Sequence, residues 1–121
     1  MKRVTGIGGI SFQARDARAL RAWYQQHLGI DVQDWGGTVF RAADGDSTTW
    51  NISPAGNDSY GPSAAPFMVN YRVDNLDALL DALRDEGCHV IGSEASVYGK
   101  FGWVLDPEGN KVELWEPPGD A

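Results

Sequence analysis

The chain has 121 residues, a net charge of −7 and one cysteine, Cys88. This length is typical of a single domain, which we expect to span residues 1–121. The acidic balance argues against nucleic acid or an anionic membrane as a partner, because both require a positive protein face. No run approaches the ~20 apolar residues of a membrane-spanning helix. A lone cysteine excludes an intramolecular disulfide and a cysteine-rich zinc site, so we predict a reduced, cytoplasmic protein.

The first half of the chain predicts a strand, a helix and two further strands. An alternating apolar run over residues 7–14 is typical of a strand. Asp16 can cap a helix in which apolar residues recur at helical spacing, and Gly29 ends that helix. Segments with strand-like composition follow at residues 38–42 and 48–52.

The second half predicts a similar series of elements. Either Asp74 or Asn75 caps a second helix with a leucine-rich apolar stripe, and Gly87 ends it. The strand-like segments of this half cover residues 67–73, 97–105 and 111–115.

The similarity of the two halves indicates an internal repeat. When residues 9–16 are aligned with 68–75, apolar positions coincide at alternate residues and a polar cap ends both segments. When residues 48–54 are aligned with 111–117, both segments end in proline. The connection between the halves is rich in Gly, Pro, Ser and Asn, as expected of a surface linker. The predicted βαβββ units cover residues 4–54 and 66–117, with a linker over 55–65.

Three segments carry a resemblance to a known family. They are WYQQHLG at residues 23–29, YRVDNLD at 71–77 and LDPEGNKVELW at 105–115. On these segments the chain resembles the vicinal oxygen chelate superfamily, the group of glyoxalases, bleomycin-resistance proteins and extradiol dioxygenases. The resemblance implies an α+β fold in which two βαβββ units form a U-shaped mixed sheet around a cavity, with the helices outside. It also implies a homodimer and a small-molecule ligand.

The resemblance further implies a divalent metal held by four side chains, at positions that correspond here to Gly9, Trp50, Met68 and Glu113. Only Glu113 has a side chain suited to a hard or borderline cation, since an indole N–H donates and a thioether prefers soft metals. One carboxylate does not supply the three or four ligands of a catalytic metal. We therefore predict no metal and no cofactor.

The walls of the expected cavity follow from strand alternation. If residues 106–110 form the last hairpin loop, Trp103 pairs with Glu113, and paired residues share a face of the sheet. The pairing of the strand next to Trp50 is open by one residue, so either Phe40 or Val39 with Arg41 shares its face. The predicted ligand-binding residues are Phe40, Trp50, Tyr60, Met68, Asn70, Arg72, Tyr98, Phe101, Trp103, Glu113 and Trp115.

Three of these residues carry more specific expectations. Tyr60 and Tyr98 lie next to glycines in segments that we expect to form mobile loops over the cavity mouth. Glu113 has two interpretations, either a functional carboxylate or one half of a buried ion pair with Arg72 or Arg41.

Aromatic walls favour metal-independent binding of a small aromatic or amphipathic molecule, a sequestration of the bleomycin-resistance type. The alternative is an enzyme, which would be a glyoxalase-like lyase or isomerase or a dioxygenase. Such an enzyme would depend on a metal or use Glu113 as a general base. A third interpretation is an interaction module in which the aromatic residues only fill the concave face.

Overall fold

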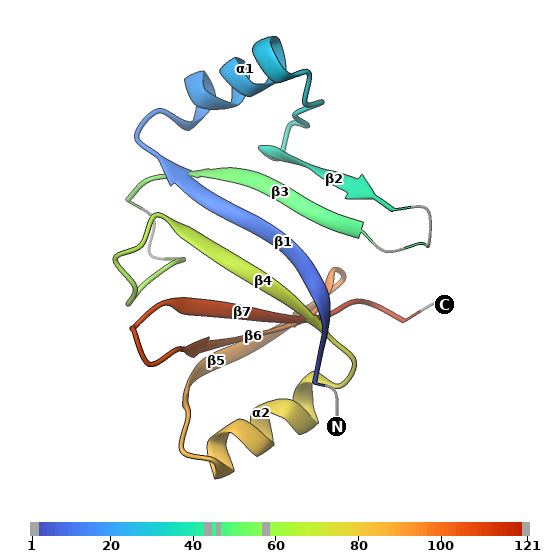
Figure 1. Cartoon of the computed structure of the whole chain (residues 1–121), viewed down its shortest axis with the longest axis vertical. Coiled ribbons are helices and arrows are strands. Elements are labelled where there is room, and N and C mark those ends of the chain that lie inside the picture. The colour runs from blue at the N-terminus through green and yellow to red at the C-terminus, as the bar shows by residue number, and fades with distance from the viewer. Residues whose placement is uncertain (1–2, 43–44, 46, 57–58, 120–121) are drawn as a thin grey trace.

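The computed structural model describes residues 3–42, 45, 47–56 and 59–119, which form two helices and one seven-stranded sheet (Figure 1). The strand order is β2-β3-β1-β4-β7-β6-β5. Within the described residues the elements are β1 (Val4–Ala14), α1 (Ala17–Leu28), β2 (Gly37–Arg41), β3 (Ser47–Pro54), β4 (Phe67–Val73), α2 (Leu76–Asp85), β5 (His89–Ser96), β6 (Gly99–Leu105) and β7 (Lys111–Glu116).

The sheet shows the repeat directly. In the first unit β1 pairs with β3 in parallel, and in the second unit β4 pairs with β7 in parallel. An antiparallel β1–β4 ladder joins the two units at the centre of the sheet. Figure 1 shows α1 and α2 at opposite ends of the molecule with the strands between them. The predicted α+β fold with a mixed sheet is confirmed.

The two units differ in their strands. The second unit has three strands after its helix, whereas the described part of the first unit has two. Between α1 and β2 the chain makes a turn, in which the Gly36 amide donates to the Gln33 carbonyl at 2.9 Å. Glycine and aspartate are frequent in this segment and are poor strand formers. The first unit is therefore a shortened version of the second.

One strand boundary in the second unit differs from the expectation. The sequence predicts a single strand over residues 97–105, but Val97 and Tyr98 form a turn between β5 and β6. Gly99 has a φ of 113°, a backbone conformation that breaks the extended chain. The sequence assigned no strand to the segment that forms β5.

Both helix starts agree with the sequence. The Asp16 carboxylate accepts the Ala19 amide at 3.0 Å, and Gly29 ends α1 with a φ of 69°. Of the two candidate caps for α2, Asn75 is the one used, because its side chain accepts the Ala78 amide at 3.1 Å. In the described part of the chain no helix has the length and apolar character needed to span a membrane.

The two helices pack on the sheet to different extents. The core lies under α2, where Leu76, Leu79 and Leu80 meet Val73 of β4 and Leu114 of β7. Around α1 the contacts are aromatic, since Tyr24 packs edge-on against Phe12 of β1 and Trp50 of β3. Both helices thus cover one face of the sheet, and the opposite face remains available for a site.

Candidate functional site

The face opposite the helices carries most of the predicted ligand-binding residues of the second unit. Asn70 pairs with Glu113 in the β4–β7 ladder, and Glu113 pairs with Trp103 in the β6–β7 ladder. Arg72, Trp115 and Phe101 follow the same pairing two positions further on. Because paired residues share a face, the structure places together Met68, Asn70, Arg72, Phe101, Trp103, Glu113 and Trp115.

Glu113 is held by two neutral donors. The Trp103 indole N–H donates to one carboxylate oxygen of Glu113 at 2.8 Å, and the Asn70 side-chain amide donates to the other at 2.8 Å. Arg72 instead donates to the backbone carbonyls of Ile7 and Ser47, at 3.2 and 2.5 Å. The interpretation of Glu113 as half of an ion pair with Arg72 or Arg41 is therefore wrong for the residues that the structure describes.

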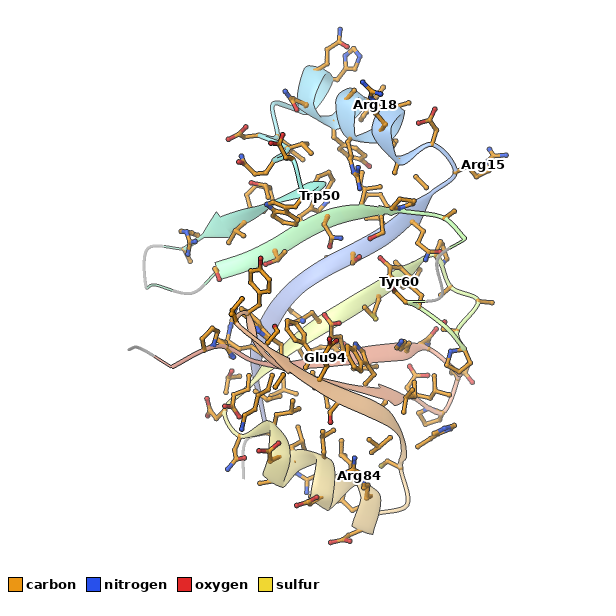
Figure 2. The ribbon with its side chains drawn as sticks, turned by 180° about the vertical axis from the view of Figure 1, so that it is seen from behind. Arg15, Arg18, Trp50, Tyr60, Arg84 and Glu94 are labelled. Carbon is orange, nitrogen blue, oxygen red and sulfur yellow. The ribbon has the colours of Figure 1, made fainter. Side chains whose placement is uncertain are left out.

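Trp50 does not face this site, contrary to the expectation. It lies opposite Ile10 in the β1–β3 ladder, and its ring packs against Phe12 and Tyr24 at centroid distances of 5.7 and 5.1 Å. Figure 2, which labels Trp50, shows it near β2 and β3 on the α1 side of the molecule. The repeat alignment was in error by one residue, and such a shift moves a strand side chain to the other face. Asn51, which pairs with Ser11, is the neighbour that faces the site.

Phe40 was predicted to line the site, but it lies on the opposite face of the sheet, the face that carries Trp50. Phe40 pairs with Thr48 and is 50% exposed, on the side of the sheet that carries Trp50. Its neighbours Val39 and Arg41 alternate with it and lie on the concave face. Of the two options left open by the sequence, Val39 with Arg41 therefore lines the site, although neither shares a face with Trp50.

A small chamber with a mainly apolar surface and a few polar side chains lies at the centre of the concave face. It has a volume of about 90 Å³, and its walls include Ser11, Thr49, Asn51, Asn70 and Trp115. The Asn70 side-chain oxygen is buried there without a hydrogen-bond partner among the described residues. Gly8 is required for this packing, because a Cβ at Gly8 would lie 2.0 Å from that oxygen. The inner chamber thus presents an unsatisfied acceptor.

A larger hollow adjoins the inner chamber, with Thr49 and Trp115 in both walls. Its volume is about 830 Å³, within the range of about 300–1,000 Å³ that is usual for small-molecule sites. Residues from β2 and β3 line one side, and the β5–β6 turn lines the other, so the sheet curves around the space. The apolar lining residues are Trp35, Val39, Val97, Tyr98, Trp115 and Pro118, and the polar ones are Arg41, Ser47 and Thr49.

Trp115 forms a fixed wall between the two spaces. Its indole N–H donates to the Tyr98 carbonyl at 2.8 Å, and its ring stacks on Phe101 with an interplanar angle of 18°. Gly99 allows the β5–β6 turn to pack closely on β7, because a Cβ at Gly99 would lie 2.3 Å from the Glu116 carbonyl oxygen. The tryptophan is therefore oriented before any ligand arrives.

Tyr60 does not lie where the sequence predicted. It is only 4% exposed, and its hydroxyl is hydrogen-bonded to Ser11, which pairs with Met68 on the concave face. Figure 2 labels Tyr60 beside the central strands. Tyr60 is therefore buried against Ser11 of the concave face and is not exposed over the cavity mouth, contrary to the expectation. Tyr98, by contrast, is 73% exposed and lines the larger hollow.

The donors on this face do not fit a divalent cation. The side chains around the inner chamber are hydroxyls and amides, and both Glu113 oxygens already accept N–H bonds. Within the described ranges no cluster of three His, Cys, Asp or Glu side chains could hold a metal ion. Catalytic metals need three protein ligands in most sites. The side chains around the inner chamber therefore lack the ligand set of a catalytic metal.

The sequence missed several lining residues. Thr49 and Asn51 have the alternation that would place them in the site, but the register error at Trp50 turned them outward. Trp35 lies in a loop without periodicity, so no local pattern indicates its place in the wall of the larger hollow.

The architecture is a curved mixed sheet built from two repeated units and open on the face away from its helices. The chain belongs to the Glyoxalase/Bleomycin resistance protein/Dioxygenase superfamily, which matches residues 6–114. This confirms the resemblance found in the sequence. A comparison with curated protein sequences finds no match.

Solved structures with the same fold are distant in sequence. Methylmalonyl-CoA epimerase from Mycobacterium tuberculosis is 20% identical with a TM-score of 0.70, and the match covers 98% of this chain and 92% of that chain. A Streptomyces coelicolor methylmalonyl-CoA epimerase variant in complex with 2-nitronate-propionyl-CoA is 16% identical with a TM-score of 0.71, covering 96% and 99%. A Legionella pneumophila structure described as NAD-dependent benzaldehyde dehydrogenase is 12% identical with a TM-score of 0.61, covering 91% and 98%. At these identities the likeness concerns the fold alone.

Proposed function

We propose that this protein binds a small aromatic or amphipathic molecule in the concave face of its sheet, without a metal. The observation that carries the proposal is the larger hollow, whose walls include the rings of Trp35, Tyr98 and Trp115. Flat aromatic walls bury ligand area and stack on rings without a closely matched set of polar groups. The adjoining inner chamber adds hydroxyl and amide groups that can orient a polar substituent.

The exposure of these aromatic side chains supports binding over simple core packing. Trp35 is 51% exposed and Tyr98 is 73% exposed, although both line the same hollow. Side chains that serve as core are buried to a few per cent, as Leu76 and Leu114 are. The aromatic surface is thus available to a ligand.

Ligand titration followed by tryptophan fluorescence tests this proposal, with naphthalene and indole derivatives as probes. Trp35→Ala should weaken binding by at least about 1 kcal/mol, which is the energy of an aromatic contact. Trp23→Ala is the matched control, because Trp23 is 48% exposed on α1 and does not line the larger hollow. Binding of no probe, or an equal loss in both variants, would exclude the hollow as the site.

An enzyme that uses Glu113 as general base is the second candidate. It is supported by the position of Glu113, whose carboxylate is hydrogen-bonded to Asn70, a wall residue of the inner chamber. The test is to incubate the protein in D₂O with each probe that it binds and to measure deuterium incorporation into the probe. Glu113→Gln should abolish exchange and leave affinity nearly unchanged, since only the transition state needs the proton acceptor. Equal exchange in the two proteins would exclude this role.

We also propose that the protein forms a homodimer through the sheet face between its helices. Val4, Ile7, Ile10 and Phe67 lie on this face of the central β1–β4 ladder and are 40–52% exposed. β1 and β4 are the corresponding strands of the two repeat units, so the patch lies where the repeats meet and suits a self-complementary two-fold contact. Ile10→Lys should convert a dimer to a monomer in sedimentation experiments, whereas a monomeric unmodified protein would contradict the proposal.

The cytoplasmic location stays a prediction.

A further inference from the structure

We infer that Arg41 makes the larger hollow selective for aromatic molecules that carry a carboxylate. This inference rests on the proposed binding function and assigns the class of ligand. From the sequence, Arg41 was expected either to share the cavity face with Val39 or to pair with Glu113.

Arg41 is the last residue of β2 and pairs with Ser47 of β3, which also lines the hollow. Among the described residues that line this space, Arg41 is the only one with a charged side chain. Its guanidinium makes no hydrogen bond or ion pair with any residue that the structure describes. Five N–H donors are therefore available beside the aromatic walls.

Arg41 differs from the other basic residues by its position. Arg3, Arg84 and Lys100 each pair with a carboxylate. Arg15 and Arg18, at the start of α1, form no ion pair with a described residue either, but among the described basic residues only Arg41 lines the larger hollow. A guanidinium that lines a hollow and pairs with no described residue is suited to a partner supplied from outside.

A second arginine supports the strand end on which Arg41 lies. Arg72 donates to the Ser47 carbonyl at 2.5 Å and to the Ile7 carbonyl at 3.2 Å, which ties β3 to β1. Ser47 is the ladder partner of Arg41. The backbone that carries Arg41 is therefore held in place, and this limits the ordering that ligand binding requires.

The chemistry of the wall and of Arg41 together define the ligand class. A planar carboxylate accepts two parallel N–H bonds from a guanidinium, and such charge-assisted bonds are about twice as strong as neutral ones. Trp35, Tyr98 and Trp115 provide the surface for an attached ring. A ring with a carboxylate satisfies both features, whereas a cationic ring would be repelled by Arg41.

The test compares three probes with the same ring: 2-naphthoate, the neutral 2-naphthamide and the cationic 2-naphthylmethylammonium. Affinities are measured by tryptophan fluorescence for the unmodified protein, Arg41→Gln, Arg41→Lys and Arg18→Gln. Arg18 is the matched control because it is an exposed arginine on α1 (Figure 2) that does not line the hollow, and its loss changes the net charge equally. Melting temperatures confirm that each variant is folded.

We expect the unmodified protein to bind 2-naphthoate at least about tenfold more tightly than 2-naphthamide, the ratio that one charge-assisted contact provides. Arg41→Gln should remove this preference, Arg41→Lys should retain part of it, and Arg18→Gln should leave it unchanged. Equal affinity for the naphthoate and the amide, or an equal effect of Arg18→Gln and Arg41→Gln, would overturn the inference while leaving the proposed function intact. Binding of none of the three probes would refute both.

Discussion

Trp103 and Glu113 lie opposite each other in the β6–β7 ladder, and the Trp103 indole N–H donates to the Glu113 carboxylate at 2.8 Å. The Asn70 amide donates to the second carboxylate oxygen from the next strand. Three strands thus converge on one acid through neutral donors. This arrangement fixes the floor of the concave face and occupies the oxygens that a metal would otherwise use.

Removal of the indole donor tests this network. Trp103→Phe leaves one Glu113 oxygen without its donor, which should cost about 1–3 kcal/mol of unfolding free energy. The measurement is urea denaturation. Trp35→Phe serves as the control, because the Trp35 indole makes no hydrogen bond with a described residue, and it should change stability by less than about 0.5 kcal/mol. Equal effects would show that the bond to Glu113 does not stabilise the fold.

Metal removal should have no effect on stability. EDTA should leave the melting temperature unchanged, and added Zn²⁺, Ni²⁺ or Mn²⁺ should not raise it, because a ligand that binds only the native state would stabilise it by mass action. The reason is the donor set, in which Glu113 is the only carboxylate that the structure places beside Asn70 and Trp103. A rise on metal addition that Glu113→Gln abolishes would contradict this expectation.

Trp50 should matter for stability and not for ligand binding. Trp50→Ala removes contacts with Phe12 and Tyr24, and we expect a loss near the lower end of the about 3–5 kcal/mol found for buried aromatic residues. The affinity for 2-naphthoate should stay the same. Trp115→Leu should instead weaken the binding of 2-naphthoate, since Trp115 lines both the inner chamber and the larger hollow. Weakened binding in folded Trp50→Ala would contradict its position under α1.

The core under α2 should be sensitive to truncation. Leu114 is 5% exposed and packs with Leu76 and Leu80, so Leu114→Ala should cost about 2–5 kcal/mol in denaturant unfolding. Val97→Ala is the control, because Val97 is 84% exposed and should tolerate the change within about 0.5 kcal/mol. A loss below about 1 kcal/mol for Leu114→Ala would place the core elsewhere.

The hairpin between β6 and β7 should make stability depend on pH. Hydrogen bonds from the Asn110 side chain and backbone to the Asp106 carboxylate hold the pKa of Asp106 below its ordinary value of 3.8. A pKa lowered on folding stabilises the protein above the unfolded value, and this stabilisation is lost as the pH falls through the folded pKa. Asp106→Asn should therefore be less stable than the unmodified protein near neutral pH.

The difference in stability between Asp106→Asn and the unmodified protein should narrow in acid, because protonation of Asp106 removes the stabilisation that the ionised carboxylate provides. Urea unfolding at neutral pH and well below pH 3.8 measures both differences. Asp34→Asn, which removes an exposed aspartate, controls for the change in net charge. A gap for Asp106→Asn that stays constant with pH would mean that its hydrogen bonds do not favour the ionised form.

Local signals in the sequence predicted the elements that depend on near neighbours. Asp16 and Gly29 bound α1 as expected, because capping and left-handed termination involve only the adjacent turn. The Trp103–Glu113 pairing also followed from the sequence, since a short hairpin loop sets the register of its two strands. The family and the α+β fold followed from the same motifs.

The register between distant segments depended on the tertiary structure. By itself the sequence determined the caps, the last hairpin, the leucine core of α2 and the aromatic character of the concave face. The tertiary structure decided that Trp50 packs under α1, that Tyr60 is buried against Ser11 and that Arg41 and Trp35 line the larger hollow. These positions depend on the parallel β1–β3 pairing and on the curvature of the sheet, and both arise from contacts between residues far apart in the chain. A one-residue change in such pairing reverses every side chain of a strand, and no local pattern in the first unit was strong enough to set it.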